Sequence, residues 1–333
     1  MPENHPPIPT PKIGVLLVNL GTPDAAEAGA VRRYLAEFLS DPRVVEIPRI
    51  AWMPILHGII LRTRPSKSAH AYAQVWTAEG SPLAAITRRQ AVALNGAFGP
   101  GVVLDYAMRY GRPAIADRLA ALKAQGCERI LVAPLYPQYC AATTATANDA
   151  AFAALATMRW QPALRTLPPY YDDPAYIAAL ATSVRESLAA LDFEPDAVMA
   201  SFHGMPQRTL ELGDPYHCHC RKTARLLSDA LGRELLVCFQ SRFGRAKWLE
   251  PATDTMLAAL PGKGVKRIAL VAPGFSADCV ETLEELSIRG RETFLAAGGT
   301  HFAALPCLND SAAGIAMLET IIMRELEGWM RLP

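Results

Sequence analysis

The run Gly14-Val15-Leu16-Leu17-Val18 lies within an apolar segment, Lys12 to Leu20, that is followed at once by Gly21-Thr22-Pro23-Asp24. A short apolar run that stops at such a turn is typical of a buried parallel strand. The alternation of similar runs with helical stretches predicts an α/β fold with parallel sheets. The other runs are Val102 to Ala107, Arg129 to Ala133, Ala197 to Phe202, Glu234 to Phe239 and Arg267 to Ala272, and the helical stretches include Ala114 to Ala124 and Tyr176 to Leu191.

Three segments of the first half resemble three segments of the second half in the same order: Val18 to Pro23 and Ser201 to Pro206, Met108 to Arg112 and Ser241 to Arg245, Arg129 to Thr144 and Arg267 to Leu283. Similarity in a fixed order within one chain indicates a duplicated unit. We predict two similar α/β lobes, residues 1–180 and 181–310, and a C-terminal helix in 311–333 that packs back on them. Two such sheets bring the carboxyl ends of their strands around a shared cleft, where ligands bind.

The positions at which the two halves differ are the informative ones. Leu20 ends the first strand of the first half, and His203 takes its place in the second. Ala141-Ala142 in the first half corresponds to Val280-Glu281 in the second. The second lobe therefore carries a histidine and an acid where the first carries apolar residues.

Residues 201–206 and 273–285 are the candidates for chemistry. His203 ends a strand, which in an α/β cleft is a common catalytic position, although a histidine there can also cap the backbone. Asp278, Glu281 and Glu285 lie at the start of a helix, where acids often do no more than interact with the helix dipole. Together with His203 they form a plausible relay of one base and a line of carboxylates.

The composition excludes several classes of protein. The chain has 333 residues, of which 51% are hydrophobic and 20% charged, with 33 Lys and Arg against 32 Asp and Glu. This is a globular composition without a basic block that would bind nucleic acid. Residues 1–11 lack the order of a signal peptide and no stretch has the ~18 apolar residues of a membrane span, so we expect a cytoplasmic protein.

The seven cysteines do not form a recognisable framework. An odd number in a chain of this length favours reduced thiols over disulfides. His217-Cys218-His219-Cys220 supplies only two thiolates, and a closed zinc or iron–sulfur site needs about four ligands. Cys140 and Cys238 could complete such a set in space, but we expect no metal cluster.

Residues 47–64 are apolar, are interrupted by Pro48, Pro54 and Gly58, and end with Arg62 and Arg64. A core helix would explain this pattern. So would an exposed apolar lip with a basic edge, suited to a flat apolar ligand or a membrane surface. Periodicity does not decide between these two interpretations.

Seven segments of the chain resemble the ferrochelatase family, in family order, from about residue 12 to about residue 310. They are Val18 to Pro23, Gly80 to Pro82, Tyr136 to Tyr139, Ser201 to Gly204, Gly213 to Tyr216, Phe239 to Gly244 with Trp248 to Pro251, and Pro273 to Glu285. The resemblance implies two Rossmann-like lobes around a porphyrin cleft. It also implies a lyase of haem biosynthesis that inserts Fe²⁺ into protoporphyrin IX, with loss of two pyrrole protons and haem as the product.

The resemblance also implies roles for individual residues of this chain. His203 and Glu281 would be the catalytic pair and would contact the metal, with Asp278 and Glu285 as further metal ligands and Phe275 nearby. Residues 47–64 would be the active-site lip. Because an insoluble planar substrate is best received from a bilayer and this stretch is apolar with arginines at its edge, we also expect a peripheral contact with the inner membrane through these residues. The substrate-binding residues would be Asn19, Leu20, Arg109 and Tyr139 on the porphyrin wall and Tyr72, Ser81 and Arg62 at the propionates.

The chain departs from the family at two places. Some members carry a third acid one turn beyond the residue equivalent to Glu285, where this chain has Arg289. Some members bind a [2Fe–2S] cluster through a cysteine-bearing C-terminal extension, where this chain offers only Cys307. We therefore expect no tightly bound cofactor and Fe²⁺ only as a substrate. The alternatives are a chelatase for coproporphyrin or sirohydrochlorin, or a non-enzymatic tetrapyrrole carrier.

Overall fold

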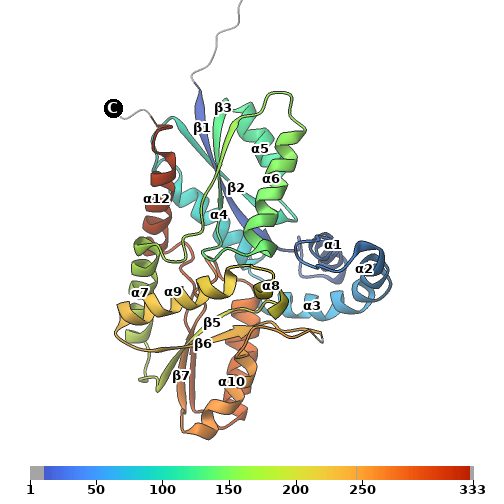
Figure 1. The fold of residues 1–333 in the computed structure, drawn as a ribbon. Helices are drawn as coiled ribbons and strands as arrows, with labels where there is room; N and C mark the ends of the chain where they lie inside the picture. The colour runs from blue at the N-terminus through green and yellow to red at the C-terminus, as the bar shows by residue number, and fades with distance from the viewer. Residues whose placement is uncertain (1–10, 245, 331–333) are drawn as a thin grey trace, which may run out of the picture.

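The computed structural model describes residues 11–244 and 246–330, and contains two four-stranded parallel sheets (Figure 1). The first sheet has the order β2-β1-β3-β4 and the second the order β6-β5-β7-β8, so the two topologies are the same. The predicted α/β fold with two similar lobes is confirmed. The strands are β1 (Lys12–Gly21), β2 (Val102–Tyr110), β3 (Cys127–Pro134), β4 (Ala163–Thr166), β5 (Ala197–His203), β6 (Leu235–Gln240), β7 (Arg267–Val271) and β8 (His301–Ala304).

Both faces of the central strands are buried, which explains their continuous apolar runs. Val15 to Val18 of β1 are all 0% exposed, so neighbouring residues on opposite faces are equally covered. The largest apolar cluster contains side chains of both sheets, among them Leu17 and Phe202. The two lobes therefore share part of one core.

Helices cover the first sheet, and three of them project to one side of it (Figure 1). The projecting group is α1 (Ala28–Leu39), α2 (Arg49–Ile55) and α3 (Leu61–Val75), with the π-helical segment η1 (Leu56–Ile60) between the last two. The others are α4 (Pro82–Leu94), α5 (Ile115–Ala124), the π-helix η2 (Ala141–Ala145) and α6 (Thr146–Ala156). The predicted lip is thus part of a continuous helical excursion rather than a core helix.

The helical segments of the second lobe differ in length and include one π-helix. They are α8 (Gln207–Glu211), α9 (Tyr216–Leu231), α10 (Thr253–Ala259), the 3₁₀ segment η3 (Leu260–Lys263), the π-helix η4 (Glu281–Gly290) and α11 (Arg291–Ala296). The equivalent strands β3 and β7 are each followed by a π-helix, η2 and η4. The structural likeness of the two lobes therefore extends to this unusual element.

Two helices join the lobes. The helix α7 (Pro174–Ala189) lies between the sheets along the chain and contacts both α9 and α12 (Ala312–Leu326). Asp173 caps α7 by accepting from the Ala175 amide, and its carboxylate also pairs with Arg324 of α12 at 2.7 Å. In addition α12 contacts α4 and β3 of the first lobe, beside which it lies in Figure 1.

The strand register corrects one of the internal sequence matches. Asn19 pairs with Met108, and Phe202 pairs with Phe239. If Asn19 and Phe202 are equivalent, as the first match requires, Met108 is equivalent to Phe239 and not to Ser241. The match of Met108 to Arg112 with Ser241 to Arg245 is therefore wrong by two residues, because both segments contain an Arg-aromatic-Gly-Arg pattern that aligns by letters alone.

In each lobe a glycine lies at the end of the first strand, because a backbone carbonyl of the neighbouring strand leaves no room there for a Cβ atom. A Cβ on Gly21 would lie 1.9 Å from the Tyr110 carbonyl oxygen, and Gly21 also has a φ of +118°. A Cβ on Gly204 would lie 2.4 Å from the Gln240 carbonyl oxygen, which accepts the Gly204 amide. Both contacts fix the end of the first strand against its neighbour.

Candidate active site

His203 is the last residue of β5 and is half-buried. Its Nδ1 lies 2.7 Å from the carbonyl oxygen of Gly204, which can only accept, so Nδ1 carries the proton. The neutral ring therefore presents an unprotonated Nε2 as a proton acceptor or metal ligand. The Tyr216 hydroxyl donates to the His203 carbonyl and helps to hold the strand end in place.

Gln240 connects the end of β6 to the start of η4. It pairs with His203 in the sheet, its side-chain oxygen accepts from Ser201, and its Nε2 donates to the carbonyl of Glu281 at 3.0 Å. Gln240 is 2% exposed, so these bonds replace water for a buried amide. This side chain brings the first residue of the π-helix to the end of the strand that carries His203.

Glu281 begins η4 and is half-buried. Its charge contributes to raising the pKa values of Tyr34 and Tyr72, mainly an effect of burial, so the carboxylate lies near these phenols of the first lobe. Val280 packs against the apolar cluster of the lip. Glu281 therefore lies where the second lobe meets the lip.

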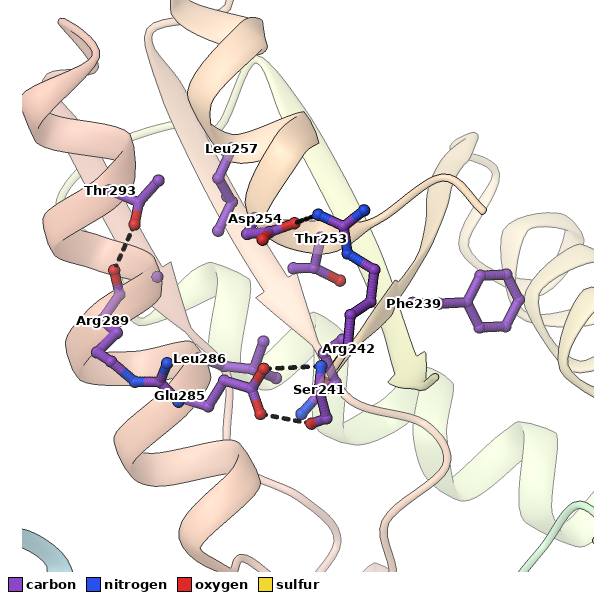
Figure 2. A pocket seen from close by; sticks show the side chains of 12 residues that line it. Phe239, Ser241, Arg242, Thr253, Asp254, Leu257, Glu285, Leu286, Arg289 and Thr293 are labelled. Carbon is purple, nitrogen blue, oxygen red and sulfur yellow. Dashed lines mark hydrogen bonds and ion pairs between the residues drawn. The ribbon is translucent and has the colours of Figure 1, made fainter. Parts of the chain in front are cut away.

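Glu285 lies four residues further along the π-helix, and both of its carboxylate oxygens accept from Ser241 (Figure 2). One bond comes from the Ser241 amide at 2.7 Å and the other from its hydroxyl. Burial raises the pKa of Glu285, and the Ser241 bonds and the nearby His203 partly offset that effect. The positive φ of Ser241, 65°, is a strained conformation for a serine and coincides with this double contact.

A cavity of about 130 Å³ lies between β6, α10 and η4, and Glu285 is part of its lining (Figure 2). Arg242 pairs with Asp254 at one side of the cavity. Arg289, the residue that departs from the family, pairs with the buried Glu284 at 2.8 Å. Glu285 is thus the acid of this helix that faces the cavity.

The carboxylate of Asp278 is buried and hydrogen-bonded within the protein. It is 8% exposed, its Oδ1 accepts from Thr282, and its Oδ2 accepts from the Asn309 side-chain amide. It lines a second cavity, of about 400 Å³, which is also lined by Glu79, Arg89 and Leu283 but by neither His203 nor Glu281. The structure thus places Asp278 apart from the cavity that Glu285 lines.

The predicted metal ligands do not form a closed cage. Across residues 11–244 and 246–330, no three His, Cys, Asp or Glu side chains gather closely enough to hold one ion. His203, Glu281 and Glu285 are close enough to influence one another electrostatically.

Three predicted substrate residues of the first lobe lie at or near the end of β1 or at the start of α4. Asn19 is 5% exposed and donates to Thr87 of α4. Leu20 is half-buried against the lip cluster. Ser81 is 5% exposed and its Oγ accepts from the Thr22 hydroxyl at 2.8 Å, which leaves its own O–H to donate.

Arg109 takes part in a network within the first lobe. Its guanidinium pairs with Asp41 and donates to the backbone and side chain of Thr146, and it lies 4.3 Å from the centre of the Tyr110 ring. Burial tends to raise the pKa of Asp41, but bonds from Thr146 and Tyr110 and the Arg109 charge lower it. Sequence reasoning missed this structural role, because Asp41 lies 68 residues away along the chain.

The remaining predicted substrate residues differ in their exposure. Tyr139 and Phe275 are half-buried, and Phe275 packs against the apolar clusters of the second lobe. Tyr72 is 9% exposed, with a pKa raised mainly by burial. Arg62 is exposed on α3.

The lip exposes aliphatic side chains but not its tryptophan. Ile50 is 90% exposed, Ile59 57% and Ile55 41%, whereas Trp52 is half-buried and donates to the Leu39 carbonyl. Arg64 lies over the ring of Phe243 in the second lobe, 5.1 Å from its centre. Trp52 is therefore a smaller part of the exposed surface than the isoleucines, and its indole anchors the lip to α1.

The sequence of the chain matches the model of the ferrochelatase family over residues 12–326. The chain belongs to the ferrochelatase family. It is 57% identical to the ferrochelatase of Rhizobium meliloti strain 1021, covering 98% of both chains. It is 55% identical to that of Agrobacterium fabrum strain C58, covering 99% of this chain and 98% of the other. As a member, this chain is an iron-inserting lyase of haem biosynthesis, and the alternatives are not favoured.

Two solved structures share the fold at low sequence identity. SirB from Bacillus subtilis with Fe³⁺ matches with a TM-score of 0.55 at 13% identity, over 96% of this chain and 97% of the other. DR2241 from Deinococcus radiodurans, described as structurally similar to chelatases, matches with a TM-score of 0.52 at 12% identity, over 94% of this chain and 55% of the other. These matches support the chelatase-like α/β fold and nothing more specific.

Proposed function

We propose that this chain inserts Fe²⁺ into protoporphyrin IX with His203 as the proton acceptor. The observation that supports this role is the bond from His203 Nδ1 to the Gly204 carbonyl, which places the hydrogen of a neutral ring on Nδ1 and directs Nε2 to accept. Metalation replaces two pyrrole N–H protons by one Fe²⁺, so the products are haem and two protons. A neutral imidazole can accept such protons near neutral pH and pass them on.

Glu281 and Glu285 would receive the iron. In the described part of the chain, neither of them forms an ion pair with Lys or Arg, so their charge is available to a cation. Because only a few oxygen and nitrogen ligands would contact the ion at any time, Fe²⁺ would bind weakly enough to be released to the porphyrin. Asp278, which is engaged by Thr282 and Asn309, would contribute charge rather than direct ligation.

The porphyrin would lie against the first lobe and the lip. Leu20, Tyr139 and Phe275 are half-buried and would supply apolar contact area. Asn19 and Arg109 are held in polar networks and would shape the wall from behind. Arg62, Tyr72 and Ser81 would hold the propionates, with the exposed guanidinium of Arg62 as the main source of affinity.

The test is iron insertion by His203→Ala, measured anaerobically with protoporphyrin IX and Fe²⁺ by the Soret and Q bands. We expect turnover to fall at least ~10²-fold, as for other general bases, while porphyrin binding followed by fluorescence stays nearly unchanged. Loss of porphyrin binding with unchanged turnover at saturation would assign His203 to the wall instead. Coproporphyrin III serves as the competing substrate.

We also infer that the chain works without an iron–sulfur cluster. Cys140 and Cys220 belong to the core shared by the lobes, Cys238 packs on the opposite face of the second sheet, and Cys218 is exposed. These positions do not fit a four-thiolate cluster. Acid-labile sulfide at the level of a stoichiometric cluster in the pure protein would contradict this inference.

The exposed isoleucines of the lip would attach the protein reversibly to the cytoplasmic face of the inner membrane. No helix in the described part of the chain is long and apolar enough to cross a bilayer. Ile50, Ile55 and Ile59 lie close to the basic side chain of Arg62 along the chain, a combination that favours an anionic lipid surface.

Replacing Ile50, Ile55 and Ile59 by serine should reduce sedimentation with anionic liposomes several-fold and leave the thermal unfolding midpoint unchanged, since all three are exposed. Trp52 stays in place because it anchors the lip. Val92→Ser on α4, at a residue that is 69% exposed, is the control for loss of surface hydrophobicity elsewhere. Equal liposome binding by the triple variant and the parent protein would remove the membrane role of the lip.

A further inference from the structure

The segment that carries Tyr139 is held by the opposite lobe. It follows β3 in the first lobe, and three of its polar groups bond to residues in or just before α9 of the second lobe. Gln138 donates to the Thr223 hydroxyl at 3.1 Å, the Tyr139 amide to His219 Nδ1 at 3.2 Å, and the Ala141 amide to Asp214 at 2.8 Å. Figure 1 shows α9 lying across the molecule between the two sheets.

The groups on α9 are themselves fixed. The His219 ring stacks on Tyr171 with 3.6 Å between ring centres and 9° between planes. Thr223 donates to the Tyr171 carbonyl, and the second oxygen of Asp214 accepts from the Tyr216 amide. The helix therefore presents acceptors that are oriented before any substrate binds.

The bond to His219 sets the direction of the Tyr139 backbone. An amide in a partly buried segment needs an acceptor, and losing that acceptor destabilises the segment when water cannot replace it. His219 Nδ1 can accept only if it carries no proton, which places the ring hydrogen on Nε2. Next to it, the Cys140 side chain is 1% exposed, so the segment has little freedom to shift without opening the shared core.

We propose that His219 is a positioning residue for iron insertion, whose Nδ1 holds the Tyr139 amide from the other lobe and so fixes the porphyrin wall. This inference rests on the proposed function, in which Tyr139 contacts the porphyrin. His219 does not itself contact substrate. Its effect passes through one hydrogen bond to the segment that begins η2, so it should act on porphyrin binding rather than on proton transfer at His203.

Two replacements separate the acceptor from the ring. His219→Phe keeps an aromatic ring on Tyr171 and removes the acceptor, whereas His219→Asn places an amide oxygen at the position of Nδ1 and removes the ring. With saturating Fe²⁺, His219→Phe should raise the KM for protoporphyrin about five- to tenfold, as expected for one lost hydrogen bond, and change kcat less than twofold. His219→Asn should restore most of the KM.

His217→Phe is the matched control, because His217 lies on the same helix and its ring stacks on Phe239 of its own lobe. It should leave the KM unchanged. In a Tyr139→Ala background, His219→Phe should have no further effect on KM, since the residue it positions is gone. An unchanged KM in His219→Phe, equal effects of the Phe and Asn variants, or full additivity with Tyr139→Ala would overturn the proposal.

If His219→Phe does not fold, His219→Gln replaces it, because its amide oxygen lies one bond beyond the position of Nδ1. Protection of the Tyr139 amide from hydrogen exchange gives a second readout. It should fall in His219→Gln and persist in His219→Asn, and equal protection in both would overturn the proposal. A parent protein that inserts no iron into protoporphyrin would instead refute the proposed function, independently of these variants.

Discussion

The two lobes have the same topology, but the carboxylate of Asp41 in the first has a cation as partner and that of Glu285 in the second has none in the part of the chain that the structure describes. In the first lobe Asp41, whose side chain is 7% exposed, pairs with Arg109 and accepts from Thr146 and Tyr110. In the second lobe Glu285 is held by the neutral Ser241 alone among the described residues, and burial raises its pKa. The first lobe neutralises its buried carboxylate, whereas the second leaves a carboxylate near His203 without a cation.

This difference indicates how a duplicated unit acquires one active site. The paired charge of the first lobe adds to the stability of a wall, because an ion pair with satisfied hydrogen bonds has little affinity for a further cation. In the proposed function, the substrate Fe²⁺ would supply the counter-charge that Glu281 and Glu285 of the second lobe lack. The acids at the π-helix are therefore costly to the fold and useful to the reaction, as strained active-site groups often are.

The largest effect on iron insertion is expected when the first residue of the π-helix η4 is replaced by its counterpart in the first lobe. Glu281→Ala gives this position the side chain of its counterpart, Ala142, and should reduce iron insertion by about 10²- to 10³-fold, in the range of general acid–base groups. Thermal unfolding should change little, since Glu281 is only half-buried. Ala142→Glu is the reverse control and should produce no gain in activity. Activity within tenfold of the parent protein in Glu281→Ala would mean that the lobes do not differ at this position in the way we infer.

The second-largest expected effect is a loss of stability caused by a replacement in the first lobe. Asp41→Asn leaves Arg109 without its counter-charge, and we expect the free energy of unfolding at pH 7 to fall by about 2–4 kcal/mol. Since the folded-state pKa of Asp41 is lowered, its contribution is present above the ordinary pKa of about 3.9 and is lost as pH falls through the folded value. The gap between parent and variant should therefore narrow as pH falls below about 4 and close only below the folded-state pKa. Denaturant unfolding at pH 7 and at successively lower pH values measures the gap, and a gap that does not narrow as pH falls would contradict the charge argument.

Most of the fold was predictable because its signals are local. The run at Val15 to Val18 is continuous and apolar, since a central parallel strand is buried on both faces. The edge strands β4 and β8 were missed, because each has only four residues, none of them fully buried. The π-helical character of η4 has no counterpart in the hydrophobic pattern.

The site was predictable where the two halves could be compared and not where it depends on distant contacts. His203 and Glu281 differ from Leu20 and Ala142 in the sequence itself. The roles of Arg109 and His219 depend on Asp41 and on the Tyr139 amide, which lie 68 and 80 residues away. The position of His219 between two cysteines suggested a metal ligand. Nothing in the neighbouring sequence indicated that it accepts a hydrogen bond from the Tyr139 amide of the other lobe.

The smallest expected effect is on iron binding, and it distinguishes the role of Glu285 from that of Glu281. Glu285→Gln keeps the shape and the contact with Ser241 but removes the charge. We therefore expect the KM for Fe²⁺ to rise about five- to tenfold and kcat to stay within threefold, as for groups that support a metal site. Because burial raises the folded-state pKa of Glu285, its ionisation costs stability as pH rises through the folded value. The Gln variant lacks this cost, so at pH 8 its unfolding midpoint should equal or exceed that of the parent. At pH 4 we do not expect the variant to reach the midpoint of the parent. Ser241→Ala is the companion variant, which keeps the acid, removes one donor and should raise the pKa of Glu285 further. A lower midpoint for Glu285→Gln at pH 8 would show that its charge is as well compensated as that of Asp41, and the contrast between the lobes would then rest on Glu281 alone.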